Sequence, residues 1–223
     1  MKPENENKML ENTQETIQDQ VKKPDEIGGF HFEGHIKIFD PDTKEVYIDK
    51  RNAIHYENMS VAMVNSLSNQ GQGTIYEMVF GTGGTTVDPT GIITYLTPNT
   101  VGVNTSLYNQ TYRKVIDQTA IENVDPNRNR MEIRHISGAT YSDIIVSCLL
   151  DYGEPDGQEA FDNSQDLSGS FVFDELGLKS YNPDGSGKLL THVIFHPVQK
   201  SLNRLIQIDY TIRIQSLTGF TEV

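Results

Sequence analysis

The chain has little of what marks an exported or membrane-bound protein. Its single cysteine, Cys148, cannot close a disulfide within the chain, and its setting in I-I-V-S-C-L-L predicts a small buried side chain. No apolar run approaches the roughly 18–20 residues needed to cross a bilayer. The Met1 end is polar and acidic, where a secretion signal would be basic and then apolar. We therefore expect no export by such a signal and no membrane partner.

Basic residues are scarce relative to acidic ones. The chain has 18 Lys and Arg against 31 Asp and Glu, which gives a formal net charge of −13 at pH 7. A surface with this charge repels a phosphate backbone unless basic side chains are segregated into a patch, and the sequence shows no such run. We therefore expect no direct contact with nucleic acid.

Residues 1–27 are poor in apolar side chains and form a flexible arm by prediction. Met1 to Glu26 contains seven acidic residues, four lysines and many Asn and Gln. Such a segment buries too little surface to offset its ordering entropy, so alone it should be disordered. A thin apolar stripe remains, which would allow a helix to dock if a partner supplied the other surface. The candidate assembly contacts on this arm are Met9, Leu10, Ile17 and Val21.

The clearest secondary-structure signal is near the end of the chain. Between Arg204 and Leu217, Ile206, Ile208, Tyr210, Ile212 and Ile214 fall on one parity, and polar residues fall on the other. This alternation predicts a half-buried strand whose register is strongly fixed. It is the best candidate for the central strand of a sheet.

Other short apolar or alternating segments predict further strands. They lie at 30–38, 46–48, 75–80, 92–96, 131–136, 144–150, 171–173 and 189–196, separated by stretches rich in Asn, Asp, Gly and Pro. About eight or nine strands with long polar loops and one helix predict a mainly β fold, an antiparallel β-sandwich, as one domain over residues 28–223.

One amphipathic helix is predicted near residues 53–70. Apolar residues recur there at spacings of three and four, and Gly71 follows where the helix should stop. Asn52 or Asn58 would serve as its N-cap. The predicted buried stripe is Tyr56, Met59, Met63 and Leu67.

Glycines and histidines raise two possible ligand sites. Gly81–Thr85 (G-T-G-G-T) could cradle phosphate with backbone N–H groups, but it lacks the Lys-Ser/Thr of a P-loop, so a plain loop after a strand is favoured. His31 and His35, like His192 and His196, are four residues apart. On a strand that spacing is about 13 Å, too far for one zinc ion. His55 or His135 could complete a site across strands, although structural or surface roles are favoured.

Carboxylate clusters do not match a known calcium or catalytic pattern. Asp151, Glu154 and Asp156 lack the EF-hand spacing, as do Asp40 and Asp42, so solvated loops are expected. The sequence has no G-x-S-x-G, and Cys148 is predicted to be buried. We expect no catalytic residues, no cofactor and no metal, so the chain is predicted not to be an enzyme.

Four sets of residues, taken in order, resemble a known class of proteins. They are I-D-K-R-N-A-I-H-Y-E-N-M-S (48–60), V-F-G-T-G-G-T-T (79–86), S-L-Y-N-Q-T-Y-R-K (106–114), and F-D-E-L-G-L (173–178) with L-L-T-H-V-I-F-H-P-V-Q-K (189–200) and the closing strand. This order resembles virion structural proteins of tailed bacteriophages. There, G-x-G-G-T-T and L-x-N-x-x-x-R precede F-D-E-x-G-L, L-L-x-x-x-x-F-x-P-V-x-K and a closing strand.

The resemblance implies a β-sandwich module of the phage tail, neck or baseplate that assembles as a symmetric ring. It implies a homo-oligomer in contact with other virion proteins, made in the host cytoplasm and localised in the virion. A capsid decoration protein is an alternative within this class. The alternative from a different functional class is a carbohydrate-binding module or glycan-active tail component, since β-sandwiches commonly hold sugars; Trp is absent, and the nearest stacking candidates are Tyr76, Tyr95, Tyr108 and Tyr112.

Asp174 and Glu175 are predicted to make a contact between subunits or elements. As neighbours in a strand they point to opposite faces, so they cannot form the paired carboxylates of a glycosidase. A charge-assisted bond from either one to Arg113 or Arg204 is expected, because both arginines lie in the segments that carry the resemblance.

Overall fold

The computed structural model describes residues 29–156 and 171–217. The four arm residues singled out above therefore lie outside the described residues. Residues 31–215 belong to one compact unit. The elements are β1 (Gly29–Phe39), β2 (Val46–Ile54), α2 (Tyr56–Leu67), β3 (Ile75–Gly81), β4 (Thr85–Val87), β5 (Ile93–Tyr95), β6 (Gln110–Val115), β7 (Arg130–His135), β8 (Tyr141–Leu150), β9 (Val172–Ser180), β10 (Leu189–Gln199) and β11 (Ile206–Leu217).

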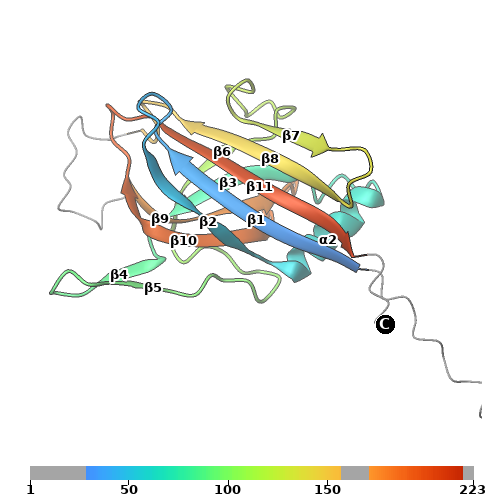
Figure 1. The fold of residues 1–223 in the computed structure, drawn as a ribbon, viewed down its shortest axis with the longest axis horizontal. Helices are drawn as coiled ribbons and strands as arrows, with labels where there is room; N and C mark the ends of the chain where they lie inside the picture. Colours follow the sequence, from blue (N-terminus) through green and yellow to red (C-terminus); the bar gives the residue numbers. More distant parts are fainter. Residues whose placement is uncertain (1–28, 157–170, 218–223) are drawn as a thin grey trace, which may run out of the picture. The chain divides into compact units, whose positions relative to one another are not determined.

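Nine of the strands form one curled antiparallel sheet, in the order β6-β3-β9-β10-β2-β1-β11-β8-β7 (Figure 1). The fold is mainly β and sandwich-like with one helix among the described residues, so the predicted fold class is confirmed. The number of strands was underestimated, because β4 and β6 were not predicted, and β4 pairs with the predicted strand β5 in a separate two-stranded ribbon. Within the described residues no helix is long and apolar enough to cross a membrane.

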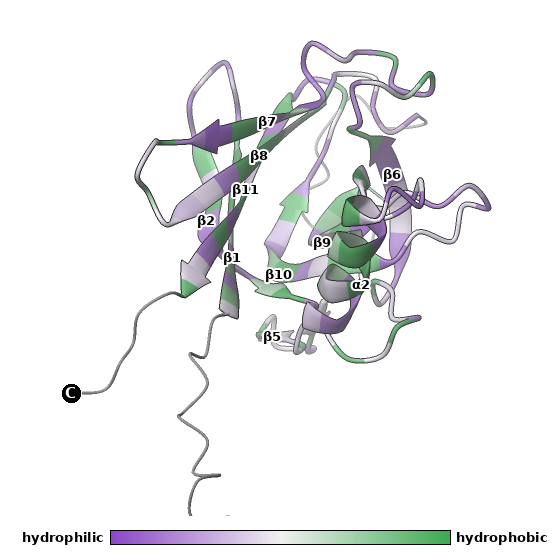
Figure 2. Cartoon of the chain, turned by 90° about the vertical axis from the view of Figure 1, so that its right-hand side faces the viewer, coloured by the Kyte–Doolittle hydropathy of each residue, from purple (hydrophilic) through white to green (hydrophobic). Residues whose placement is uncertain are grey.

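β2 connects the two layers of the curled sheet. Its first part pairs with β1 from Val46 to Asn52, and its end pairs with β10, where Ala53 lies opposite His192 and Ile54 opposite Thr191. One strand therefore belongs to both layers. Figure 2 shows the result: β1, β11, β8 and β7 lie on one side, and β9, β10 and α2 lie on the other.

β11 has the predicted register. Ile206, Ile208, Tyr210 and Ile212 are at most 2% exposed, while the residues between them are half-buried. The strand lies between β1 and β8, so it is interior to the sheet, although β2 holds the middle position. Its buried face contributes to a core that also contains residues of β1, β3, β9 and β10.

A polar link crosses this core. Asn52 of β2 donates through Nδ2 to the Tyr210 hydroxyl of β11. Gly34, which pairs with Asn52 across β1 and β2, makes room for it, because a Cβ there would lie 1.5 Å from the Asn52 Oδ1. Any side chain at position 34 would displace the amide.

The helix has the predicted position but a different cap and buried face. His55 is the N-cap, and its Nδ1 accepts a hydrogen bond from Asn58 N at 3.2 Å. Asn58 is instead buried within the helix, where its Nδ2 donates to Leu189 O. The buried residues are Asn58, Met59 and Ala62, whereas Tyr56 and Leu67 of the predicted stripe are 55% and 84% exposed.

Candidate functional site

Two buried carboxylates form the centre of the candidate site. Asp174 and Glu175 are neighbours in β9, and they are only 3% and 0% exposed. β9 lies between β3 and β10, so loops that leave or approach these strands can reach both residues. Burying a charge costs free energy unless hydrogen bonds compensate for the lost water, so the partners of each carboxylate decide its role.

Asp174 is enclosed by the glycine-rich loop that follows β3. Its Oδ1 accepts hydrogen bonds from the N–H groups of Gly83 and Gly84, both at 2.9 Å. Its Oδ2 accepts from the Thr85 N–H at 2.8 Å and from the Thr85 hydroxyl at 2.5 Å. The segment is a loop after a strand, as predicted, and its consecutive N–H groups cradle an anion. That anion is a side chain of the same protein.

The two glycines permit this close approach. A Cβ on Gly83 would lie 2.9 Å from Asn109 N, and one on Gly84 would lie 2.9 Å from Ile194 Cγ2. Larger residues would push the loop away from β9. The glycines are therefore explained by packing around Asp174.

Glu175 holds a second loop. Its Oε2 accepts from Tyr108 N at 2.9 Å, and its Oε1 accepts from Asn109 N at 2.8 Å. His192 of β10 lies 3.0 Å from Oε2 through Nε2, and both side chains are fully buried. The Asn99 N–H donates to the other ring nitrogen, Nδ1, at 2.8 Å. A neutral His192 therefore carries its proton on Nε2 and donates it to Glu175.

The arginine partners predicted for these carboxylates were wrong. Arg113 pairs with Glu77 at 3.0 Å, and Lys179 lies 3.6 Å from the same carboxylate. Arg204 donates to Gln199 O at 3.0 Å and lies 5.6 Å from the centre of the Tyr47 ring. Arg113 lies in β6, which pairs with β3 and not with β9, so Glu77 of β3 is within its reach.

The other histidines lie apart from one another. His31 and His35 contact separate carboxylates, those of Glu33 and Asp49. His196 contacts the Tyr95 hydroxyl at 3.3 Å. His55 caps α2, and His135 lies 3.0 Å from the Ser142 hydroxyl. In residues 29–156 and 171–217, no group of three His, Cys, Asp or Glu side chains is placed to hold a metal.

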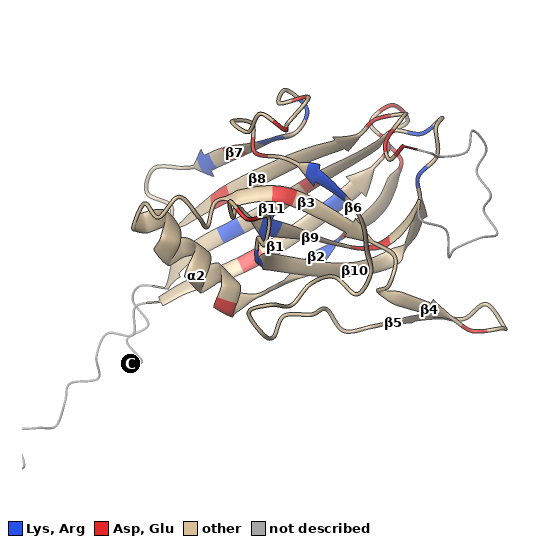
Figure 3. Ribbon diagram, turned by 180° about the vertical axis from the view of Figure 1, so that it is seen from behind, with Lys and Arg blue, Asp and Glu red and all other residues tan. Residues whose placement is uncertain are grey.

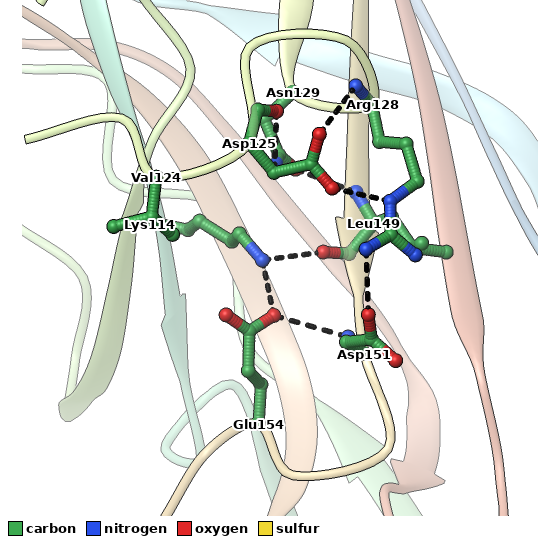
Figure 4. Close-up of a pocket in the computed structure, with 8 residues that line it drawn as sticks. All are labelled: Lys114, Val124, Asp125, Arg128, Asn129, Leu149, Asp151 and Glu154. Carbon is green, nitrogen blue, oxygen red and sulfur yellow. Dashed lines mark hydrogen bonds and ion pairs between the residues drawn. The ribbon is translucent and has the colours of Figure 1, made fainter.

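A charged pocket of about 240 Å³ lies where β6, β8 and their loops meet (Figure 4). Lys114 donates to Leu149 O at 2.7 Å and to the Glu154 carboxylate. Arg128 bridges Asp125 and Asp151. Its hydrogen bond lowers the pKa of Asp125, whereas the pKa of Asp151 is lowered first by the backbone N–H of Tyr152 and then by Arg128. The loop predicted to be solvated at positions 151 and 154 is partly exposed, with the Asp151 and Glu154 side chains 36% and 26% exposed, and both acids are also paired with basic side chains.

The tyrosines proposed for sugar stacking are mostly engaged within the chain. Tyr76 packs edge-on against Tyr181, with ring centres 5.1 Å apart. Tyr108 donates to Thr97 O at 2.8 Å and packs against His192. Tyr112 is partly buried against Phe80, and burial raises its pKa. Tyr95 is half exposed on β5.

Sequence reasoning found Asp174 and Glu175 but missed what they bind. The donors are backbone N–H groups of the loops at 83–85 and 108–109, which have no side-chain signature. His192 was noted only as half of an i,i+4 pair. The one available signal was the glycine-rich loop itself, whose N–H groups were recognised as a possible anion cradle.

Comparisons with known proteins identify no relative. No protein-family model matches the chain, and the searches of curated proteins and of solved structures returned no match. The resemblance to phage virion proteins therefore stays a prediction.

Proposed function

We propose that this protein is a non-enzymatic structural component of a tailed phage virion that assembles as a symmetric ring in the tail, neck or baseplate. The supporting observation is that the segments carrying the resemblance contact one another. The 79–86 segment binds Asp174, the 106–114 segment binds Glu175, and the 189–200 segment supplies His192. Residues far apart in the sequence thus form one hydrogen-bonded unit, as expected of motifs that define a fold.

The chemistry of this unit is that of a structural clamp. Four hydrogen bonds reach Asp174 and three reach Glu175. Charge-assisted bonds of this kind are among the strongest in proteins, and here they fix two loops to the sheet. Rigid loops with defined positions suit a subunit that must repeat the same contacts many times.

Two exposed surfaces are suited to contacts between copies. β7 is the last strand of the sheet, and its Ile133 is 82% exposed. An unpaired edge strand is a template for pairing with another chain, and Ile133 is the exposed apolar side chain of β7 among the charged Arg130, Glu132 and Arg134. The β4–β5 ribbon exposes Val87, Ile92 and Tyr95, and it is almost free of charge except near its turn (Figure 3). Two unlike surfaces on one subunit are suited to head-to-tail contacts, which form a ring when the rotation between subunits closes.

Particle composition is the direct test of this function. Phage particles purified from a lysate of the host that carries the gene should contain the chain at a fixed ratio to the major capsid protein, measured by quantitative mass spectrometry. Immunogold labelling should place it on the tail, neck or baseplate. Labelling over the whole head would replace this proposal with a capsid decoration protein, and absence from particles would refute both.

Ring formation makes a prediction about β7. Ile133→Lys should abolish concentration-dependent oligomers seen by analytical ultracentrifugation and electron microscopy, because it replaces the exposed apolar side chain of β7 with a further charge beside Arg130, Glu132 and Arg134. The matched control is Ile121→Lys, since Ile121 is 98% exposed but lies in a loop outside the strands. Both variants should melt like the wild type. If Ile133→Lys forms the same oligomers as Ile121→Lys, β7 is not a subunit contact.

A further inference from the structure

A second cavity lies where β1 and β2 part. Their pairing ends at Gly34 and Asn52, after which β2 crosses to β10 while β1 stays in its own layer (Figure 1). The fork encloses about 450 Å³, within the usual size range of small-molecule sites. Its lining residues all belong to the compact unit 31–215. The cavity therefore follows from the crossing of β2 that curls the sheet.

An aromatic ring with an open face lines the fork. Tyr56, the first residue of α2, is 55% exposed. Its hydroxyl donates to Phe32 O at 3.4 Å, and its ring packs edge-on against the Phe32 ring with centres 6.4 Å apart. These contacts hold the ring in one orientation. Its other surface is available to a ligand.

Polar side chains with unused hydrogen-bonding capacity surround this ring. The side chains of Arg51 and Glu57 line the cavity and make no hydrogen bond or ion pair with the described residues. His31 and Glu33 contact each other at 3.5 Å and are both over 40% exposed. The guanidinium offers donors in a planar fork, and the carboxylates offer acceptors. A ligand bound here would contact hydrogen-bond donors and acceptors next to an aromatic surface.

These features select the chemical class of the ligand. Glu33 and Glu57 outnumber Arg51, and the chain carries a net charge of −13, so an anionic ligand is repelled. A purely apolar ligand would leave the charged groups desolvated without partners. A saccharide has an apolar C–H face to pack on Tyr56 and hydroxyls that both donate and accept. We propose that the fork between β1 and β2 binds a neutral saccharide of one or two rings.

Titration of the full-length chain with neutral disaccharides tests this directly. Saturation-transfer NMR and calorimetry are carried out with N,N′-diacetylchitobiose, cellobiose, maltose and lactose. At least one of these disaccharides should bind saturably, with a dissociation constant of about 1 mM. Sialyllactose, which is anionic, should bind at least about tenfold more weakly than lactose, which corresponds to about 1.4 kcal/mol.

Variants assign the binding to the fork. Tyr56→Ala and Arg51→Ala should each weaken binding by about tenfold or more, whereas Tyr56→Phe should retain most of it because the ring remains. Tyr95→Ala is the matched control, since Tyr95 is 50% exposed but lies on the β4–β5 ribbon. Unchanged thermal transitions would show that the variants are folded.

Two results would overturn the saccharide site. One is no saturable binding of any of the four neutral disaccharides at concentrations of about 10 mM. The other is equal loss of binding in Tyr56→Ala and Tyr95→Ala. The saccharide site and the ring proposal can be tested separately. The Tyr56→Ala variant leaves β7 unchanged, so it should lose saccharide binding and still form oligomers. A chain that binds saccharide but forms no oligomer at any concentration tested would refute the ring and not the site.

Discussion

At the scale of single residues, Asp174 and Glu175 show how adjacent positions serve different parts of a fold. Asp174 binds the loop after β3, and Glu175 binds the loop before β6 together with His192 of β10. The strand geometry that sends neighbouring side chains to opposite faces makes this division possible. The same geometry was the reason for predicting that they are not a catalytic pair.

Asp174→Asn should destabilise the fold by about 2–3 kcal/mol, measured by urea denaturation. The amide introduced by Asp174→Asn would keep one acceptor oxygen, but its NH₂ group would face N–H donors on the other side. Either the Gly83 and Gly84 N–H groups or the Thr85 N–H group would then lose its acceptor. Amide hydrogen exchange should increase first in residues 83–85.

Asp184→Asn provides the control for that variant. Asp184 also accepts a backbone N–H and a hydroxyl, both from Ser186, but it lies in an exposed turn. Water replaces those bonds when they are lost, so its unfolding free energy should hardly change. Similar losses in the two variants would mean that the Asp174 cradle contributes nothing beyond a surface turn.

At the scale of elements, β11 shows which features a local pattern determines. Its alternation of apolar and polar residues predicted both the strand and its buried face, and the structure confirms both. Alternation has this power because a shift of one residue would expose every large apolar side chain at once. The register with β8 runs without a break from Ile206 to Gln215.

The two faces of β11 should differ in their sensitivity to truncation. Ile212→Ala should cost about 2–5 kcal/mol of unfolding free energy, because it removes burial and leaves a cavity. Gln207→Ala should cost less than about 1 kcal/mol, since that half-buried amide makes only local bonds, to Asp209 and to Ile208 O. Chemical denaturation of the monomer measures both. Equal costs would contradict the assigned faces.

Features that depend on distant residues were less predictable. The Asp174 cradle joins positions 91 residues apart, and no periodicity reports such a contact. The same limit explains the wrong arginine partners and the wrong face of α2, where Asn58 is buried because Leu189 O accepts from it. The fork at β1 and β2 was missed because it depends on the point where β2 leaves one layer for the other. Local patterns predicted most of the strands, whereas the contacts at the sites depend on which distant segments pair in the fold.

At the scale of the whole molecule, the curled sheet places several titratable groups in its interior, and these should shape its stability at alkaline pH. Burial raises the pKa of the Cys148 thiol from 9.0 to about 12, and it also raises the pKa of the Tyr210 and Tyr112 hydroxyls. Burial lowers the pKa of Lys200 from 10.5 to about 8. These shifts act in opposite directions.

The sign of each effect follows from proton linkage. A thiol with a raised folded pKa contributes stability below pH 9.0, which is lost as pH rises towards about 12, because the unfolded chain releases its proton first. Lys200 behaves oppositely: between about pH 8 and 10.5 the unfolded chain binds more protons, so stability rises with pH. Each group alone gives a slope of up to about 1.4 kcal/mol per pH unit.

Together these slopes predict an alkaline profile with three parts. The unfolding free energy should rise from about pH 8 to 9.0 through Lys200, and it should stay nearly flat up to 10.0, where Lys200 and Cys148 oppose each other. Above 10.0 the unfolded chain also releases the protons of Tyr112 and Tyr210, so the unfolding free energy should fall, most steeply above 10.5, where Lys200 no longer opposes the loss. Urea denaturation at each pH measures this curve.

Two variants separate the contributions of Cys148 and Lys200. The slopes of unfolding free energy against pH are compared, so that a pH-independent loss of stability caused by the mutation cancels. Cys148→Ala should make the flat segment rise with pH, because only the Lys200 effect remains there. Lys200→Met should make the same segment fall, because only the thiol effect remains. The general repulsion of a chain with net charge −13 grows with pH in all three proteins, so it does not alter the comparison. Parallel curves for wild type and both variants would mean that neither buried group is linked to unfolding.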